Sequence, residues 1–398
     1  MAKSIPTSEQ VAEKPSFSLR IGTTRVAAPT SNAKQSCRIL TQNRAVPLKS
    51  FCVCKQNLAE TFPISCTQKM RFHQAFFFGT LRAMDIVLSH ITALRYWLSR
   101  PSTAPRLRHD HAKLPASSTP KAAIGQLQHI ARPPFHVLCS TPIKGGALHG
   151  VSHHAWRTPL PPDAVFRISP SVRVCSPELA FLQVAQSLET ANLVRLGFEL
   201  CGCYSLDSNA DGGFFGRAPL TTPERLQLLC DQLAAVRGIR NAKVALPHIL
   251  ANSASPAETR IAMALSLPHR HGGLGLPAPC MNQRIQLSAN EQKLLRKRYF
   301  SCDLYWPDRK LAVEYDSDAH HTGAEKIATD AARRNSLQYA DVKVITISSR
   351  TYRDVDEFNA TGRIIAKHLG KEIRPRCQHF TEKQSCLRRT LASPPPWL

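Results

Sequence analysis

The chain combines segments without periodicity and segments whose apolar residues recur at the spacing of a helix or a strand. From Met84 onward the apolar spacing predicts a helix, with the apolar positions Ile86, Val87, Ile91, Leu94, Trp97 and Leu98. Short apolar runs at residues 135–138 and 165–168, bounded by prolines, are typical of strands joined by loops. Residues 1–83 show neither period, so we expect no packed core there.

Three helix starts share one chemistry. A hydroxyl residue precedes a proline at Ser176, Thr222 and Ser255. The hydroxyl caps a free backbone N–H, and proline fits the first helical position, which predicts helices over residues 177–190, 223–236 and 256–267. Glu258 lies three residues after Ser255, in the position of a capping-box glutamate.

Residues 301–316 predict a β-hairpin with a turn at residues 307–310. With a four-residue turn, Trp306 pairs with Leu311 and Asp303 falls opposite Glu314. The two-residue period then predicts an apolar face with Cys302, Leu304, Trp306, Leu311, Val313 and Tyr315. The other face would carry Asp303, Tyr305, Ala312, Glu314 and Asp316.

The carboxylates on this second face suggest a metal site. Directly opposed residues of a hairpin have Cβ atoms about 5 Å apart, so the carboxylates of Asp303 and Glu314 would repel one another without a cation. Asp316 adds a third carboxylate to the same face. Oxygen ligands favour Mg²⁺ or Mn²⁺. The alternative is a solvated acidic face on an edge hairpin.

The segments after the hairpin extend this pattern. A predicted helix over residues 324–338 carries Asp330, Arg333 and Arg334. Asp330 and Arg334 suit a surface ion pair four residues apart, whereas the arginines also suit phosphate contacts. Residues 342–347 are almost continuously apolar, which predicts a buried central strand.

A last helix is expected over residues 354–369 and a further strand near residues 284–287. Together with the helix that begins after Ser255, the element order of this region is α-β-β-β-α-β-α. The fold class is therefore α/β, with a mixed, mainly helical region before this core.

The order of these motifs resembles the PD-(D/E)xK nuclease core. The run from Asp303 to His320 is similar to an uncharacterised bacterial family related to the very short patch repair endonucleases, over about residues 282–370. That family shows an aspartate in one strand, then Glu-x-Asp-Gly, a histidine and an Asp-x-x-Arg helix. Ser317 stands here in place of the glycine.

The resemblance implies roles for the residues that match. Asp303 and Glu314 would hold Mg²⁺ or Mn²⁺, and Asp316 stands where many relatives have a lysine that helps to activate water. His320 would share that task, and Glu258 on the leading helix could approach the site. DNA contacts would come from Lys326, Arg333 and Arg334, with Asp330 as a further site candidate.

The middle of the chain shows a looser resemblance. Residues 149–246 resemble the N-terminal half of AbiEi-type antitoxin regulators, on the segments that begin at Ser176 and Leu196. We therefore expect a basic disordered leader at 1–83, a regulator-like region at 84–250, a nuclease-like domain at 251–372 and a disordered tail at 373–398. Met84 is also a candidate for the natural start of the chain.

Composition adds a preference for polyanions. The chain has 52 Lys and Arg against 28 Asp and Glu, a net charge of +24, which favours nucleic acid. No segment looks able to span a bilayer, so we expect a cytoplasmic protein. Its 13 cysteines show no Cys-x-x-Cys pair, and we interpret most of them as buried apolar residues in a reducing compartment. We interpret the isolated histidines, including His153 and His154, as loop or surface residues.

The sequence therefore favours a metal-dependent DNA endonuclease in DNA repair or phage defence, with a homodimer or a toxin–antitoxin-like partner as open possibilities. One alternative is a DNA-binding regulator or antitoxin whose nuclease-like domain is catalytically degenerate. Another is an interaction scaffold without a nucleic-acid role.

Overall fold

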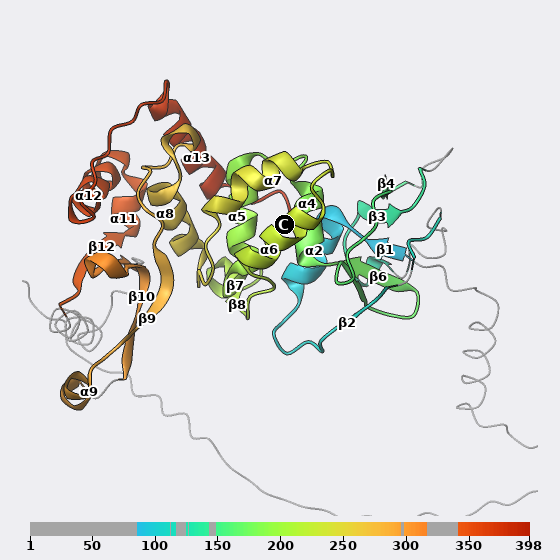
Figure 1. Cartoon of the computed structure of the whole chain (residues 1–398), viewed down its shortest axis with the longest axis horizontal. Coiled ribbons are helices and arrows are strands. Elements are labelled where there is room, and N and C mark those ends of the chain that lie inside the picture. The colour runs from blue at the N-terminus through green and yellow to red at the C-terminus, as the bar shows by residue number, and fades with distance from the viewer. Residues whose placement is uncertain are drawn as a thin grey trace, which may run out of the picture. The chain divides into compact units, whose positions relative to one another are not determined.

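The structure is a computed structural model that describes residues 86–111, 113–116, 125, 127–142, 149–295, 298–316 and 341–398 (Figure 1). The expected leader at 1–83 lies outside these residues, as does the predicted helix over 324–338. Helices and strands are mixed along the described chain, as the α/β assignment requires.

A six-stranded sheet with the order β2-β5-β6-β1-β3-β4 lies in the first half of the described chain. Its strands are β1 (Ile86–Leu88), β2 (Arg108–His109), β3 (Phe135–Cys139), β4 (Val151–Ala155), β5 (Val165–Arg167) and β6 (Val172–Cys175). The pairs β1–β6 and β3–β4 are parallel, and β1–β3, β2–β5 and β5–β6 are antiparallel.

The prediction of a helix from residue 86 is wrong at its start. Ile86, Val87 and Leu88 form the buried strand β1, and the helix α2 begins only at His90 and runs to Ser99. A short apolar run that is buried at every position, as in β1, cannot be distinguished from a buried helical segment by its period. The expected strands near residues 135–138 and 165–168 are confirmed as β3 and β5.

Helices follow the six-stranded sheet. They are α4 (Pro177–Val184), α5 (Thr190–Cys201), α6 (Pro223–Gln232), α7 (Ile239–Ala245) and α8 (Pro256–Ser266), with the small sheet of β7 (Tyr204–Leu206) and β8 (Phe214–Gly216) after α5. All three predicted caps are confirmed, because Ser176, Thr222 and Ser255 accept hydrogen bonds from backbone N–H groups of the first turn. The helices α4 and α6 end earlier than their predicted limits.

A four-stranded sheet with the order β12-β11-β10-β9 follows. Its strands are β9 (Cys280–Gln286), β10 (Tyr299–Trp306), β11 (Leu311–Asp316) and β12 (Lys343–Ser348). The strands β9, β10 and β11 pair antiparallel, and β12 is parallel to β11. Figure 1 shows α9 (Ala289–Leu295) at the outer end of the long β9–β10 pair.

The prediction that residues 342–347 form a buried central strand is wrong in its placement. The strand exists as β12, but it lies at the end of the strand order among the described residues. Ile347 is buried, whereas Lys343 and Thr346 are exposed. An apolar run shows that side chains pack against something, but it does not show on which side a strand has neighbours.

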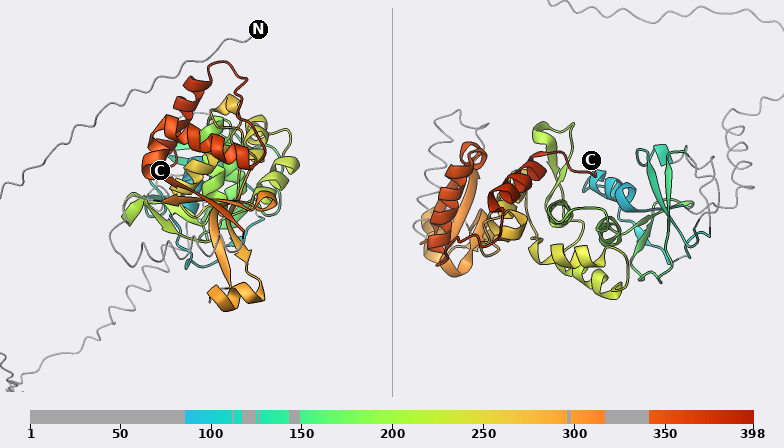
Figure 2. Two further views of the ribbon diagram at one scale, coloured as in Figure 1. Left: turned by 90° about the vertical axis from the view of Figure 1, so that its left-hand side faces the viewer. Right: turned by 90° about the horizontal axis from the view of Figure 1, so that it is seen from above.

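Helices near the carboxyl end cover the four-stranded sheet and the middle helices. The helix α12 (Val355–His368) lies beside this sheet, with the short α11 (Ser349–Arg353) before it (Figure 2). The helix α13 (Phe380–Ala392) contacts α5 and α8. The expected disordered tail over residues 373–398 is therefore wrong, because Leu387, Leu391 and Trp397 are buried there.

One hydrophobic cluster runs from Ile86 to Trp397 and includes residues on both sides of the domain boundary expected at residue 250. Across that boundary Tyr204 and Thr259 share a hydrogen bond between hydroxyls, at 2.9 Å. The described cysteines form no disulfide, and Cys139, Cys175, Cys201, Cys230 and Cys302 are buried, as expected for small apolar residues. Within the described chain, no helix has the length and apolar character needed to cross a bilayer.

Candidate functional site

The hairpin of β10 and β11 has the predicted register. Trp306 pairs with Leu311, and the ladder continues to Leu304 and Val313. The next residues along the two strands are Asp303 and Glu314. At this point the hydrogen bond between the strands is made by a side chain and not by a backbone pair. The backbone N–H of Tyr315 donates to Oδ2 of Asp303 at 2.8 Å, which fixes this carboxylate beside β11.

Among the buried residues of the hairpin, the predicted sorting of the two faces is correct except at Cys302. Leu304, Trp306, Leu311 and Val313 belong to the main core with Tyr315 at its edge, but Cys302 packs in a second cluster with Tyr305 and Ala312. The pairs β9–β10 skip Asn282 and Asp303, and Asn282 has a φ of 48°. The strict alternation of faces that we assumed is interrupted at this point.

Glu258 is buried in the first turn of α8, and its carboxylate accepts several hydrogen bonds. Its Oε2 accepts from the backbone N–H of Ala254 at 2.8 Å and from Nδ2 of Asn282 at 2.6 Å, and its Oε1 accepts from the hydroxyl of Ser255 at 2.9 Å. Glu258 therefore caps the start of α8 as expected, but through the backbone N–H of Ala254 and not that of the N-cap residue Ser255. Burial, and next the negative charge of Asp303, raise the pKa of Glu258. Glu258 and Asp303 thus lie close enough to repel one another.

The remaining acidic candidates are only partly enclosed. Glu314 and Asp316 are half-buried on β11, beside Thr346 and Ser348 of β12. In the described part of the chain, Asp303, Glu314, Asp316 and Glu258 do not bring three carboxylate oxygens within 4.8 Å of one another. His320, Lys326, Asp330, Arg333 and Arg334 lie outside the described residues.

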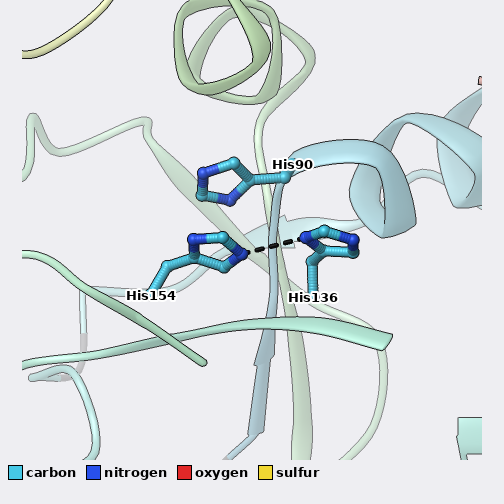
Figure 3. A group of neighbouring side chains, drawn as sticks. All are labelled: His90, His136 and His154. Carbon is cyan, nitrogen blue, oxygen red and sulfur yellow. Dashed lines mark hydrogen bonds between the residues drawn. The ribbon is translucent and has the colours of Figure 1, made fainter. Parts of the chain in front are cut away.

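A second cluster of chemically active groups lies in the six-stranded sheet. His90, His136 and His154 each offer a ring nitrogen, and these three atoms lie within 4.8 Å of one another (Figure 3). Nδ1 of His136 and Nε2 of His154 are hydrogen-bonded at 2.9 Å. The ring of His90 stacks on that of His154 with a centroid separation of 3.6 Å.

Burial keeps this histidine cluster uncharged at neutral pH. Loss of hydration lowers the pKa of His90 to about 2 and that of His154 to about 4, and the neighbouring rings add to both effects. The pKa of His136 is also lowered, first by burial and then by the charge of Arg95. A neutral imidazole carries a proton on only one of its two nitrogens, so the other nitrogen of each ring keeps its lone pair.

The histidine cluster was missed in the sequence because its members are far apart. His90 lies 46 positions before His136, and His154 lies 18 positions after it, so no short motif joins them. Our interpretation of His154 as a loop or surface residue is wrong, since it lies half-buried on β4. Only knowledge of which strands pair would have brought the three residues together.

A hollow of about 530 Å³ beside α2 and α6 is lined by several arginines, two of which bind groups of the fold itself. Arg225 pairs with Glu178 at 3.1 Å, and Arg217 donates to the backbone oxygens of Tyr204 and Glu199. Arg217 and Arg225 therefore have a structural role at this hollow.

Comparison with known proteins gives no match: no family model, no curated protein and no solved structure is similar to this chain. We therefore infer the function from the residues of the chain.

Proposed function

We propose that this chain is a metal-dependent endonuclease that hydrolyses DNA phosphodiester bonds at the β10–β11 hairpin. The main support is the position of Asp303 and Glu314, which follow the last ladder pair on adjacent strands, with Glu258 of α8 close to Asp303. The described order of α8, the antiparallel strands β9, β10 and β11, and the parallel β12 is also the order expected for the nuclease core.

The donor set suits a hard divalent cation. Carboxylate oxygens are the protein ligands that Mg²⁺ and Mn²⁺ prefer, and the repulsion between Glu258 and Asp303 is of the kind that a cation relieves. Asp303 and Glu314 would hold the ion, which when bound supplies Lewis-acid stabilisation of phosphate oxygens and a more acidic water.

The chain's own groups have separate tasks in this proposal. The hydrogen bond from Tyr315 orients the Asp303 carboxylate, and Asn282 orients that of Glu258. Asp316 or His320 would accept a proton from the attacking water. The net charge of +24 supports attraction to the DNA backbone, with an affinity that decreases as salt increases.

The test is nicking of supercoiled plasmid by the full chain with Mg²⁺, with Mn²⁺ and with EDTA. Asp303→Asn removes the charge but keeps an oxygen that accepts from Tyr315, and Glu314→Gln removes the second charge. Asp308→Asn, at an exposed position in the turn of the same hairpin, is the matched control. We expect nicking that requires metal, falls to background in the first two variants and persists in the control.

A second candidate is a DNA-binding regulator with an inactive nuclease-like domain. Two observations favour it: Asp316 replaces the usual lysine, and the described carboxylates do not gather three oxygens within 4.8 Å. If the folded chain binds duplex DNA in EDTA and nicks no plasmid with either metal, this candidate replaces the first.

A further inference from the structure

The six-stranded sheet positions three histidines from three elements on one site. His136 of β3 pairs with Ser152 of β4, so His154 lies two residues further along β4 and on the same face. His90 follows β1, whose Leu88 pairs with Val137. The backbone N–H of Ser89 donates to the carbonyl oxygen of His136 at 2.8 Å, which places His90 beside that strand.

The first turn of α2 fixes the backbone and ring of His90. This residue has a φ of 49°, which is unfavourable for a side chain other than glycine, and its N–H donates to Oε1 of Gln183 at 2.9 Å. The hydroxyl of Ser89 lies 3.0 Å from Nδ1 of His90. Ser89 is fully buried, so this contact has the character of an orienting bond to the ring.

The same turn also orients His136. The hydroxyl of Thr92 accepts from the backbone N–H of His136 at 2.8 Å, and Thr92 is fully buried as well. Two buried hydroxyls of one helical turn thus hold two of the three histidines. Such support around imidazole groups is typical of metal centres, where ligand geometry must be set in advance.

The chemistry of the cluster selects the metal. Neutral imidazoles suit zinc and other first-row transition metals, and three histidines with an open fourth position are a known catalytic zinc arrangement. Zinc–nitrogen bonds of about 2.0–2.1 Å in a tetrahedron separate the nitrogens by about 3.4 Å. The present 2.9 Å between His136 and His154 therefore needs to widen by only a few tenths of an ångström.

We propose that His90, His136 and His154 bind one Zn²⁺ ion, with water in the fourth position. The ion replaces the proton shared between His136 and His154 and ties α2, β3 and β4 together. This site is separate from the carboxylates of the hairpin and does not depend on the proposed nuclease activity.

The experiment is a zinc titration of the full chain after treatment with EDTA and removal of the chelator, with a chromophoric chelator as competitor. The double variant His136→Gln/His154→Gln removes two ligands. His109→Gln is the matched control, because His109 lies on β2 at the other edge of the same sheet. We expect one Zn²⁺ per wild-type and control chain, and loss of that equivalent in the double variant.

Two further measurements do not require the double variant to fold. Zinc should raise the melting temperature of the wild-type and control chains. Cobalt(II) should give the visible spectrum of a tetrahedral site with nitrogen and oxygen ligands in the wild type. Equal zinc stoichiometry in all folded chains, no zinc in the wild type, or thiolate charge-transfer bands in the cobalt spectrum would each overturn the proposal.

Discussion

Asn282 donates a hydrogen bond from Nδ2 to Oε2 of Glu258 at 2.6 Å and thereby joins β9 to the first turn of α8. The same amide group donates to the carbonyl oxygen of Asn252 at 2.9 Å. Asn282 has a φ of 48°, a conformation that asparagine tolerates better than most residues. Asn282 therefore has two roles: it adopts the positive φ in β9, and its side chain binds the carboxylate of Glu258.

The first prediction separates these two roles of Asn282. Asn282→Ala removes both hydrogen bonds and places a Cβ-bearing aliphatic residue at positive φ, so we expect a loss of about 2–3 kcal/mol in the free energy of unfolding. Asn282→Gly relieves the backbone but not the lost bonds, so its loss should be smaller by about 1 kcal/mol. Urea denaturation measures both. Equal losses would show that the backbone conformation is not strained.

A second prediction concerns Gly272, which has a φ of 86°. A Cβ at this position would lie 2.3 Å from the backbone oxygen of Lys383, so Gly272→Ala must displace α13. We expect a loss of about 2–5 kcal/mol in the free energy of unfolding, from the clash and the positive φ together.

Gly213 provides the control for Gly272. Its φ is 77°, but a Cβ there would meet nothing within 4 Å. Gly213→Ala should therefore cost only the backbone strain, about 1–2 kcal/mol. Similar values for the two variants in urea denaturation would contradict the close approach of α13.

The third prediction tests the burial of Trp397, whose side chain is 1% exposed. Its indole N–H donates to Oε2 of Glu199 at 2.8 Å. Trp397→Phe removes this donor and should reduce the free energy of unfolding by about 1–2 kcal/mol. Trp397→Ala also leaves a cavity and should cost about 3–5 kcal/mol. Thermal denaturation followed by circular dichroism checks the order, and unchanged melting of the alanine variant would show that the tail is not docked.

The fourth prediction is a pH dependence that originates at Glu199. Burial raises the pKa of this carboxyl, against the opposing effects of its hydrogen bonds from Leu206 and Trp397 and of the charges of Arg217 and Arg195. A raised folded-state pKa means that the folded chain binds the proton more tightly than the unfolded chain. The stability contributed by Glu199 is thus complete below the ordinary value of 4.5 and decreases as the pH rises through the folded-state pKa.

The variant Glu199→Gln isolates that effect, because its side chain does not titrate. We expect the free energy of unfolding of the wild type, minus that of the variant, to decrease as the pH rises from about 4 toward neutrality. Denaturation in urea at several pH values gives this difference. An increase with pH would mean that the folded state prefers the ionised carboxylate.

Local chemistry was predicted well from the sequence. The caps at Ser176, Thr222 and Ser255 depend on residues three positions apart, and each forms as expected. The register of the β10–β11 hairpin was also correct, because the length of its turn fixes which residues pair. In these cases the partners are neighbours along the chain, so a single sequence carries enough information.

Relationships between distant segments were not predictable in the same way. The position of β12 at the end of the strand order, the docking of Trp397 and the meeting of His90 with His154 all depend on which elements pack together. A buried histidine and an exposed one have the same sequence signature. The carboxylate site combines the two situations. Its hairpin was predictable from the local sequence, but the position of Glu258 beside the hairpin depends on how α8 packs.

The contact between α5 and α13 joins two helices that are synthesised at different times. The guanidinium of Arg195 on α5 donates to the carbonyl oxygens of Thr390 and Ser393, across 195 and 198 positions of the chain. At a synthesis rate of about 5–20 residues per second, α13 is made roughly 10–40 s after α5. The surface of α5 around Arg195 is therefore exposed to solvent during synthesis for longer than the surfaces of α5 that contact α4, α7 and α8.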